Sequence, residues 1–238
     1  MTQPPAGVRM PVVAIDGPSG SGKSSVAKGV ARELGLDYLD TGAMYRAMTC
    51  WMLQQGVDLA DQAAIAALAD APIIQSTTDP DAPGITVDGV DVSEAIRGPE
   101  VTAAVSAVSA VPAVRSRLVD RQRGEVQQSA ARGRGIVVEG RDIGSVVLPD
   151  ADLRVFLTAD LAVRAQRRAA QDAGLAHGTA GVGATHEDLQ RRDHHDSNRA
   201  ASPLQLAPGA VEVDATDLDL AQTIAAVVSL VRERVPGA

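Results

Sequence analysis

Aromatic residues and cysteines are both scarce in this chain of 238 residues. Because aromatic side chains make up only 2% of the sequence, its hydrophobic core must be built mainly from Ala, Val, Leu and Ile. The single cysteine, Cys50, excludes an intramolecular disulfide, and no group of Cys and His residues has the spacing of a zinc site. The lack of a possible intramolecular disulfide favours a protein of a reducing compartment.

Long apolar runs and an excess of positive charge are also missing. No apolar run approaches the length of a membrane-spanning helix, and the prolines within residues 1–10 are unlike the apolar stretch of a signal peptide. The formal net charge of −8 argues against a nucleic acid polymer as partner, because a phosphate backbone requires a basic surface. We therefore expect a cytoplasmic protein that binds neither membranes nor nucleic acid polymers. A small anionic ligand in a local basic cleft is still compatible with this charge.

The most specific motif is GPSGSGKSS, which occupies residues 17–25 directly after the apolar run VVAI. Its spacing, Gly17-x-x-x-x-Gly22-Lys23-Ser24, is that of a P-loop, in which glycine-permitted turns point several backbone N–H groups at a phosphate. Apolar residues at helical spacing follow Lys23, so the loop also lies at the positive end of a helix dipole. The predicted ATP-binding residues are Gly17, Pro18, Ser19, Gly20, Ser21, Gly22, Lys23, Ser24 and Ser25.

This motif predicts two chemical tasks. Lys23 would reach the β- and γ-phosphates of a nucleoside triphosphate, and the hydroxyl of Ser24 would ligate the Mg²⁺ that bridges them. We therefore expect ATP as phosphoryl donor and Mg²⁺ as cofactor.

Short apolar runs alternate with helical patterns, which predicts an α/β protein with a parallel sheet. The expected strands are Val12–Asp16, Leu36–Leu39, Ile136–Glu139, Leu153–Leu157 and Val211–Asp214. The expected helices are Lys23–Leu34, Ala43–Gln54, Asp61–Ala69, 101–111, 112–128, one from Asp160 and Leu220–Val231. Open sheets of this kind bind ligands at the carboxyl ends of their strands, so Glu139, Arg141 and Asp142 are placed beside the P-loop.

Two stretches depart from this alternation. The segment Ile73–Val92 carries Asp-Pro, Pro-Gly and Asp-Gly turn signals between short β-rich runs, which predicts a small antiparallel insertion. The segment DAGLAHGTAGVGAT, residues 172–185, has little to bury and is interpreted as a mobile connector. It leads into a polar, arginine-bearing helix that ends before Pro203. Flexible glycines before always-charged guanidinium groups are typical of a lid that closes over phosphates and excludes water.

Five segments occur in a fixed order along the chain: AIDGPSGSGKSSVAK, YLDTGAMYRA, EGRDIGSVV, FLTAD and RRDHHDSNRAASPL. With them, the chain resembles bacterial cytidylate kinases along nearly its whole length. The resemblance implies a P-loop nucleoside-monophosphate-kinase fold, with a five-stranded parallel sheet flanked by helices, a monophosphate-binding insertion and a short lid. It implies a single domain, and we expect a monomer. The implied bounds are about 10–70, 111–170 and 205–238 for the core, 71–110 for the insertion and 171–200 for the lid.

The resemblance also implies roles for individual residues. It places the contacts to cytosine and sugar at Thr41, Ser106, Arg115, Asp142, Arg192, Asp196 and Arg199. Arg46 and Arg141 match arginines that hold the acceptor phosphate, and Tyr45 completes the expected CMP site. The expected catalytic set is Lys23, Arg141, Arg192 and Arg199. For Glu139 we hypothesise a role in supporting Mg²⁺ without ligating it directly.

The chemistry of cytosine agrees with this assignment. Cytosine presents an amino donor at N4 beside acceptors at N3 and O2, so Asp142 can accept from N4 while Arg115 donates to the acceptors. Uracil reverses that edge and would leave buried polar groups unpaired, which gives a preference for cytosine. The implied activity is ATP-dependent phosphorylation of CMP and dCMP in pyrimidine nucleotide metabolism.

Two other functions are compatible with a P-loop. The first is a related kinase that acts on UMP, AMP or shikimate, against which the pairing of Asp142 with Arg115 argues. The second is a P-loop regulatory switch that binds nucleotide and signals by conformation. A switch of the guanine-binding kind would carry an Asn-Lys-x-Asp segment late in the sheet, and the sequence contains none.

Overall fold

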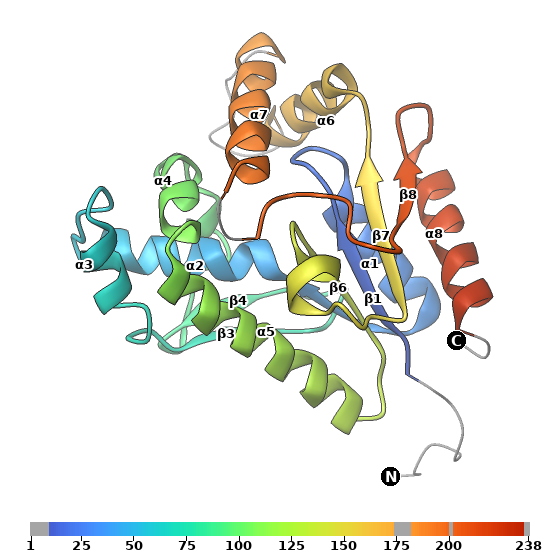
Figure 1. The fold of residues 1–238 in the computed structure, drawn as a ribbon, viewed down its shortest axis with the longest axis horizontal. Coiled ribbons are helices and arrows are strands. Elements are labelled where there is room, and N and C mark those ends of the chain that lie inside the picture. Colours follow the sequence, from blue (N-terminus) through green and yellow to red (C-terminus); the bar gives the residue numbers. More distant parts are fainter. Residues whose placement is uncertain (1–9, 174–181, 200–201, 236–238) are drawn as a thin grey trace.

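The computed structural model describes residues 10–173, 182–199 and 202–235, and its centre is a five-stranded sheet of order β2-β6-β1-β7-β8 (Figure 1). The strands are β1 (Val12–Asp16), β2 (Asp37–Asp40), β6 (Ile136–Gly140), β7 (Leu153–Thr158) and β8 (Val211–Asp214). All neighbouring strands in it are parallel. The five predicted strands are therefore confirmed, although the second lies one residue further along the chain than Leu36–Leu39.

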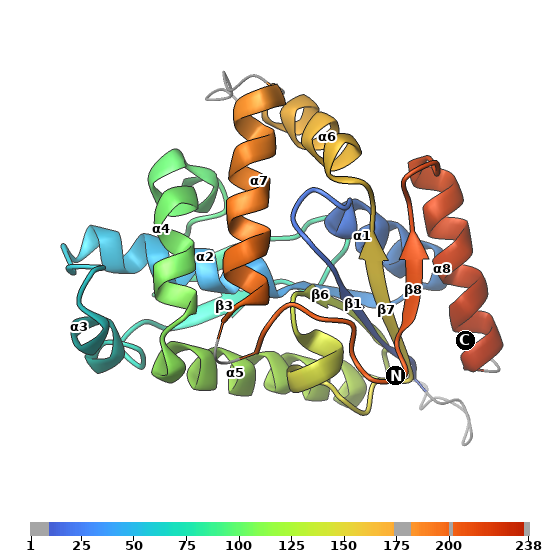
Figure 2. The same ribbon diagram turned by 45° about the horizontal axis from the view of Figure 1, so that its top comes forward.

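Helices cover both faces of this sheet (Figure 2). The four main covering helices are α1 (Lys23–Leu34), α2 (Thr41–Gln54), α5 (Pro112–Ala131) and α8 (Leu220–Arg234). In β1, Val13 and Ile15 are buried in one hydrophobic cluster with α1 and α8, whereas Ala14 is buried in a second cluster with α2 and α5. Alternate side chains of a strand point to opposite faces, so a strand that is covered on both faces carries consecutive apolar residues, as β1 does at Val13, Ala14 and Ile15.

The segment after α2 forms the predicted insertion. It contains α3 (Gln62–Ala67), β3 (Ile74–Ser76), β4 (Ile85–Val87), β5 (Val90–Asp91), η1 (Ala95–Arg97) and α4 (Pro99–Ser109). Its three strands form an antiparallel sheet of order β3-β4-β5, which confirms the prediction for Ile73–Val92. The tight connection from β4 to β5 passes through Asp88 and Gly89, with φ angles of 50° and 81°. Two consecutive positive φ angles are the reason for the Asp-Gly pair.

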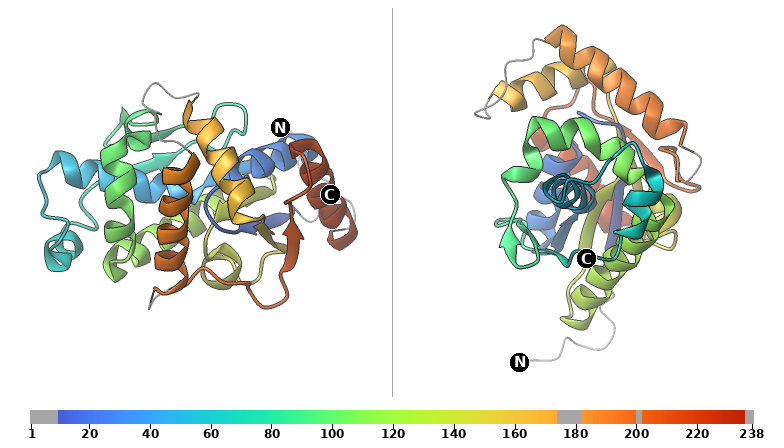
Figure 3. Two further views of the ribbon diagram at one scale, coloured as in Figure 1. Left: turned by 90° about the horizontal axis from the view of Figure 1, so that it is seen from above. Right: turned by 90° about the vertical axis from the view of Figure 1, so that its left-hand side faces the viewer.

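Two helices, α6 (Leu161–Ala173) and α7 (Val182–Ser197), form an arch over the carboxyl ends of the strands (Figures 1 and 3). The prediction of a connector at residues 172–185 is wrong at its two ends, because Asp172 and Ala173 belong to α6 and Val182–Thr185 belong to α7. A glycine inside a helix costs only about 1 kcal/mol relative to alanine, so it does not exclude a helix, and α7 packs along α6. Residues 174–181, where the rest of the prediction falls, lie outside the described residues.

Two helical starts near the carboxyl ends of the strands differ from expectation. Helix α2 begins at Thr41 rather than Ala43, because the carboxylate of Asp40 caps it by accepting from the Ala43 N–H at 3.0 Å. The polar turn expected after β6 contains a five-residue π-helix, η2 (Ile143–Val147). Short π-helical turns of this kind are frequent at functional sites. No helix within the described ranges is both long enough and apolar enough to span a membrane.

At the opposite end of the sheet, Asp37 joins three segments. Its carboxylate accepts from the Ser129 hydroxyl at 2.8 Å and pairs with Arg132 and Arg134, each at 2.7 Å. Burial acts to raise the pKa of Asp37, but the hydrogen bonds from Arg132 and Ser129 and the charge of Arg134 outweigh it, so the pKa lies below its ordinary value. The carboxylate therefore stabilises the fold wherever it is ionised.

We expect Asp37→Asn to lower the free energy of unfolding by about 1.5–3 kcal/mol at neutral pH, the usual contribution of hydrogen bonds to a charged group. The difference from wild type should persist down to the ordinary pKa of aspartate and shrink as the pH falls below it, because the wild-type carboxylate then also becomes neutral. Urea unfolding across this pH range measures the difference. A difference that grows on acidification would contradict the assigned direction of the pKa shift.

Candidate active site

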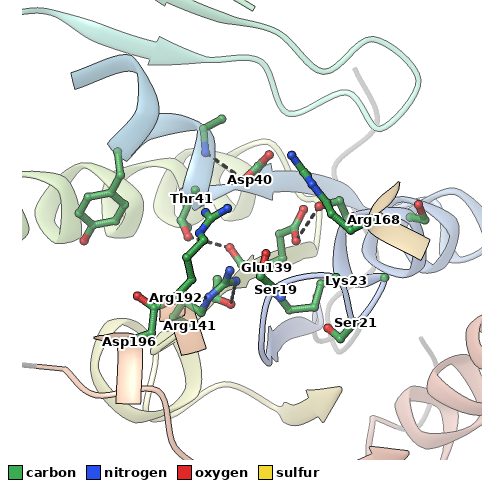
Figure 4. A pocket seen from close by; sticks show the side chains of 18 of the residues that line it. Ser19, Ser21, Lys23, Asp40, Thr41, Glu139, Arg141, Arg168, Arg192 and Asp196 are labelled. Carbon is green, nitrogen blue, oxygen red and sulfur yellow. Dashed lines mark hydrogen bonds and ion pairs between the residues drawn. The ribbon is translucent and has the colours of Figure 1, made fainter. Parts of the chain in front are cut away.

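A cavity of about 550 Å³ lies at the carboxyl ends of the strands, between the P-loop, the insertion and the α6–α7 arch (Figure 4). The predicted CMP-site residues that line it are Thr41, Tyr45, Arg46, Ser106, Arg115, Arg141, Asp142, Arg192, Asp196 and Arg199. Of the P-loop, residues 19–25 line the cavity, whereas Gly17 and Pro18 are not among its lining residues. The structure thus brings nearly the whole predicted site into one space.

The cavity is electropositive although the chain is acidic. Its lining includes nine Lys and Arg side chains and five Asp and Glu side chains, whereas the whole chain carries a formal net charge of −8. Lys23, Arg141, Arg168 and Arg192 lie around Glu139 in Figure 4. A concave site with one sign of charge and low-dielectric walls concentrates ligands of the opposite sign. The cavity therefore selects small anions.

The P-loop is shaped by its glycines. A Cβ atom at Gly17 would lie 2.0 Å from the carbonyl oxygen of Leu157, and Gly22 has a φ angle of 92°, so neither position tolerates a side chain without strain. The Nζ atom of Lys23 donates to the carbonyl oxygen of Pro18 at 2.7 Å, which holds the lysine against the loop. Burial, and next the nearby charge of Arg141, lower the pKa of Lys23. A bound anion would offset both effects.

Ser24 and Glu139 meet on the floor of the cavity. The hydroxyl of Ser24 donates to Glu139 Oε2 at 3.0 Å, and the buried hydroxyl of Tyr38 donates to Oε1 at 2.5 Å. Burial raises the pKa of Glu139, and the charge of Asp40 acts in the same direction. A carboxylate that is buried beside another carboxylate is stabilised by a nearby cation.

An ion pair with a stacked ring stands at the other end of the cavity. Arg115 Nη2 bonds to Asp142 Oδ2, and both side chains are only 6% exposed. Arg115 also donates from Nη1 to the carbonyl oxygen of Ser109 at 3.2 Å, and its guanidinium carbon lies 5.4 Å from the ring centroid of Tyr45. Three contacts from three elements thus fix a donor and an acceptor side by side. Such a pair can read a base edge that presents both an acceptor and a donor.

The α7 helix reaches into the cavity through its last turns. Asp196 Oδ2 accepts from Arg141 Nε at 3.0 Å, and its other oxygen lies 3.8 Å from Arg199 Nη1. Arg46, from α2, donates to the carbonyl oxygen of Ile96 at 3.2 Å. Burial lowers the pKa of Arg46 to about 10, and the charges of neighbouring arginines, first Arg192 and then Arg168, act in the same direction. Crowded guanidinium groups of this kind are suited to a multiply charged anion.

Sequence reasoning missed several residues of the site. The cavity is also lined by Asp40, Arg97, Arg167, Arg168 and the start of α8 at Leu218, Asp219, Leu220 and Thr223. Arg164 Nη1 donates to the carbonyl oxygen of Ser19 at 3.0 Å and to Asp193 Oδ2 at 2.5 Å, which links α6, α7 and the P-loop. The helical spacing of Arg164 and Arg168, four residues apart after a strand end, could have indicated the α6 residues. No comparable pattern marks the start of α8.

The strand order and the place of the P-loop between β1 and α1, together with the small antiparallel insertion and the helical arch, define a P-loop nucleoside monophosphate kinase. The family model for cytidylate kinase matches residues 13–233. The chain therefore belongs to the cytidylate kinase family.

Two cytidylate kinases are similar in sequence to this chain over almost its full length. A cytidylate kinase of Streptomyces coelicolor is 57% identical over 226 residues, which cover 95% of this chain and 94% of that protein. A cytidylate kinase of Streptomyces avermitilis is 56% identical over 223 residues, covering 94% of this chain and 93% of that protein. An uncharacterized protein from Eubacterium ventriosum, 12% identical, shares the fold with a TM-score of 0.52 over 94% of this chain and 100% of its own.

The surplus of positive charge predicts that polyphosphate anions stabilise the protein. At a hundred times its dissociation constant, inorganic triphosphate should raise the unfolding temperature by roughly 5–10 °C, from the usual linkage of binding to stability. Thermal unfolding with and without triphosphate measures this, with sodium chloride at equal ionic strength as control. Lys23→Met should lose most of the increase. An equal increase in Lys23→Met would show that triphosphate binds elsewhere.

Proposed function

We propose that the protein transfers the γ-phosphoryl group of ATP to CMP or dCMP, giving ADP and CDP or dCDP, in pyrimidine nucleotide metabolism. The observation that carries this proposal is the continuity of one cavity from the P-loop to the buried pair of Arg115 and Asp142. A polyphosphate-binding loop and a group that can read a base edge therefore face the same space. The names and the high identity of the relatives point to the same substrates.

The donor end consists of the P-loop amides and Lys23. Residues 19–25 line the cavity, and α1 begins at Lys23, so its positive dipole end faces the phosphates of ATP. Lys23 leaves its internal partner, the carbonyl oxygen of Pro18, to bind the β- and γ-phosphates. In the transfer itself, an oxygen of the acceptor phosphate bonds to the γ-phosphorus while the bond from that phosphorus to the bridging β–γ oxygen breaks. The negative charge of that transition state is balanced by Lys23 and the arginines of the cavity.

Ser24 and Glu139 are suited to Mg²⁺. Their contact places a hydroxyl and a carboxylate oxygen 3.0 Å apart beside the P-loop, with the carboxylate of Asp40 also lining the cavity. No cluster of three or more His, Cys, Asp and Glu within the described ranges could hold a metal alone, which suits an ion that keeps waters and shares the phosphates of its nucleotide. When bound, Mg²⁺ neutralises charge on the phosphate oxygens. Ser24 would ligate it, and Glu139 would hold Ser24 and nearby waters in place.

The acceptor end consists of a base site and a phosphate site. We propose that Asp142 accepts from the N4 amino group of cytosine, that Arg115 donates to N3 or O2, and that Thr41, Ser106 and Tyr45 complete the base pocket. The acceptor phosphate is held by Arg46 and Arg141. The sugar faces the α7 side chains. We propose that the sugar or the transferring phosphoryl group is contacted by Arg192, Asp196 and Arg199.

Exclusion of water is the task of the arch formed by α6 and α7. Without it, water would compete with CMP for the phosphoryl group. Arg164 and Asp193 already connect both helices to Ser19 of the P-loop. We propose that 171–200 is the lid, 71–110 is the monophosphate-binding insertion, and the remainder is the core of a single monomeric, cytoplasmic domain.

Two alternatives are less well supported. A kinase for UMP, AMP or shikimate would not need a carboxylate that is paired to an arginine and faces a base pocket. A P-loop switch would leave the arginines around the acceptor site without a task.

Asp142→Ala should remove the preference for cytosine. We expect kcat/KM for CMP and dCMP to fall roughly 10- to 100-fold, the cost of one hydrogen bond to a buried charge, while UMP is affected much less. A coupled assay of ADP formation with CMP, dCMP, UMP, AMP and GMP measures this. Asp150→Ala, which removes an exposed carboxylate from the same connection, is the control and should keep the wild-type preference.

Equal use of UMP and CMP by the wild type would contradict the proposed reading of the base while leaving a P-loop kinase. No turnover with any monophosphate would contradict the kinase proposal and favour the switch.

Glu139→Gln should weaken the binding of the Mg²⁺ on which turnover depends. Because the carboxylate that orients Ser24 is lost, the Mg²⁺ concentration for half-maximal rate should rise roughly tenfold. Titration of Mg²⁺ at saturating ATP and CMP measures it. Glu125→Gln is the matched control, because both glutamates are 4% exposed but Glu125 lies in α5 and does not line the cavity. Unchanged activity and unchanged Mg²⁺ dependence in Glu139→Gln would remove this residue from the metal site.

A further inference from the structure

A carboxylate outside the cavity caps the turn that carries Asp142. Asp16 is the last residue of β1, is 4% exposed and is not among the lining residues. Its Oδ1 accepts from the Ile143 N–H at 2.8 Å and its Oδ2 from the Gly144 N–H at 2.7 Å. Asp16 points to the same face of the sheet as Ala14, where Ile143 and η2 pack. Two segments more than 120 residues apart are thereby joined.

These two amides are the first two of η2, whose preceding residue is Asp142. An aspartate at that position ordinarily turns its own carboxylate back onto the amide of the second or third helical residue, here Gly144 or Ser145. Here Asp142 makes no such cap and has φ and ψ angles of −144° and 24°. Its carboxylate is bonded to Arg115 instead. Of these two amides, that of Gly144 is already occupied by Asp16, which also holds the amide of Ile143 before it.

We propose that Asp16 is a positioning residue for acceptor specificity: by capping the η2 turn, it leaves the carboxylate of Asp142 on Arg115 and directed at the base pocket. This inference rests on the proposed function of the cavity. Asp16 itself does not touch the acceptor.

Stability alone does not explain a carboxylate at this position. Burial raises the pKa of Asp16 to about 6, and the charge of Asp142 adds to this, while the two amide hydrogen bonds and the charge of Lys23 oppose it. A carboxyl group whose pKa is raised in the folded state makes the fold less stable as the pH rises from the ordinary pKa of aspartate through the raised one, so the ionised side chain costs stability at neutral pH. The pKa of Asp37 is lowered instead. Ionisation therefore stabilises the fold at Asp37 and destabilises it at Asp16.

The test compares Asp16→Asn with Asp37→Asn. Both variants replace a buried aspartate in the central sheet, but Asp37 lies at the amino end of β2, far from the cavity in the strand direction. In Asp16→Asn, one acceptor becomes an amide donor that faces a backbone N–H, so the turn loses a hydrogen bond and Asp142 can fold back to replace it. Steady-state kinetics with CMP and UMP, at temperatures well below each unfolding transition, measure the consequence.

For Asp16→Asn we expect the ratio of kcat/KM for CMP to that for UMP to fall roughly tenfold, with a higher KM for CMP and a KM for ATP within about twofold of wild type. Asp37→Asn should lose stability and keep the wild-type ratio. Calorimetric titration of CMP and UMP without ATP should show the same loss of discrimination in Asp16→Asn.

Three results would overturn the inference. An unchanged ratio and CMP affinity in Asp16→Asn would show that Asp142 keeps its position unaided. A raised KM for ATP with every acceptor used at its wild-type ratio would assign Asp16 to the adjoining P-loop. If Asp16→Asn does not fold, Asp16→Ser replaces the amide with a hydroxyl, whose oxygen accepts while its proton can rotate away from the backbone N–H groups, and failure of both to fold would make Asp16 a purely structural residue. A wild type without preference for CMP would instead contradict the proposed function.

Discussion

The rest of the structure depends on a cavity in which nine Lys and Arg side chains are held close together with only five Asp and Glu side chains among them. Burial, and after it the repulsion between like charges, lowers the pKa values of Lys23 and Arg46. Such an arrangement persists only if the surrounding fold fixes the chain on every side. The parallel sheet does this, because it ends its strands together and is covered on both faces.

The carboxylates of the site moderate this repulsion. Asp196 lies between Arg141 and Arg199, Asp142 pairs with Arg115, and Asp193 reaches from α7 to Arg164. Asp193 Oδ1 also accepts from the Ser19 N–H at 3.4 Å, so a carboxylate of α7 rests on a P-loop amide of the kind that binds phosphate. A phosphate that binds this amide would compete with Asp193 for it.

The sequence predicts the parts of this protein that depend on local chemistry. The P-loop spacing, the strand positions and the turn-rich insertion are visible as residue patterns. The arginines of the cavity were expected from the family resemblance, which did not indicate Arg97, Arg167 and Arg168. Features that depend on distant segments were not predictable. The π-helical turn η2 requires an acceptor from β1, and α2 begins early because Asp40 caps it. The helical ends of the glycine-rich segment likewise differ from what its composition indicates.

The end of β1 shows why such distant contacts matter for function. Gly17 begins the P-loop and cannot carry a side chain, because the carbonyl oxygen of Leu157 occupies that space. Asp16, the residue before it, holds the turn that presents Asp142. One strand end therefore fixes both the P-loop, the proposed donor site, and the turn that carries Asp142, the proposed acceptor contact. A shift of β1 against β6 would displace both together, so the relative placement of donor and acceptor groups depends on the register of two neighbouring strands.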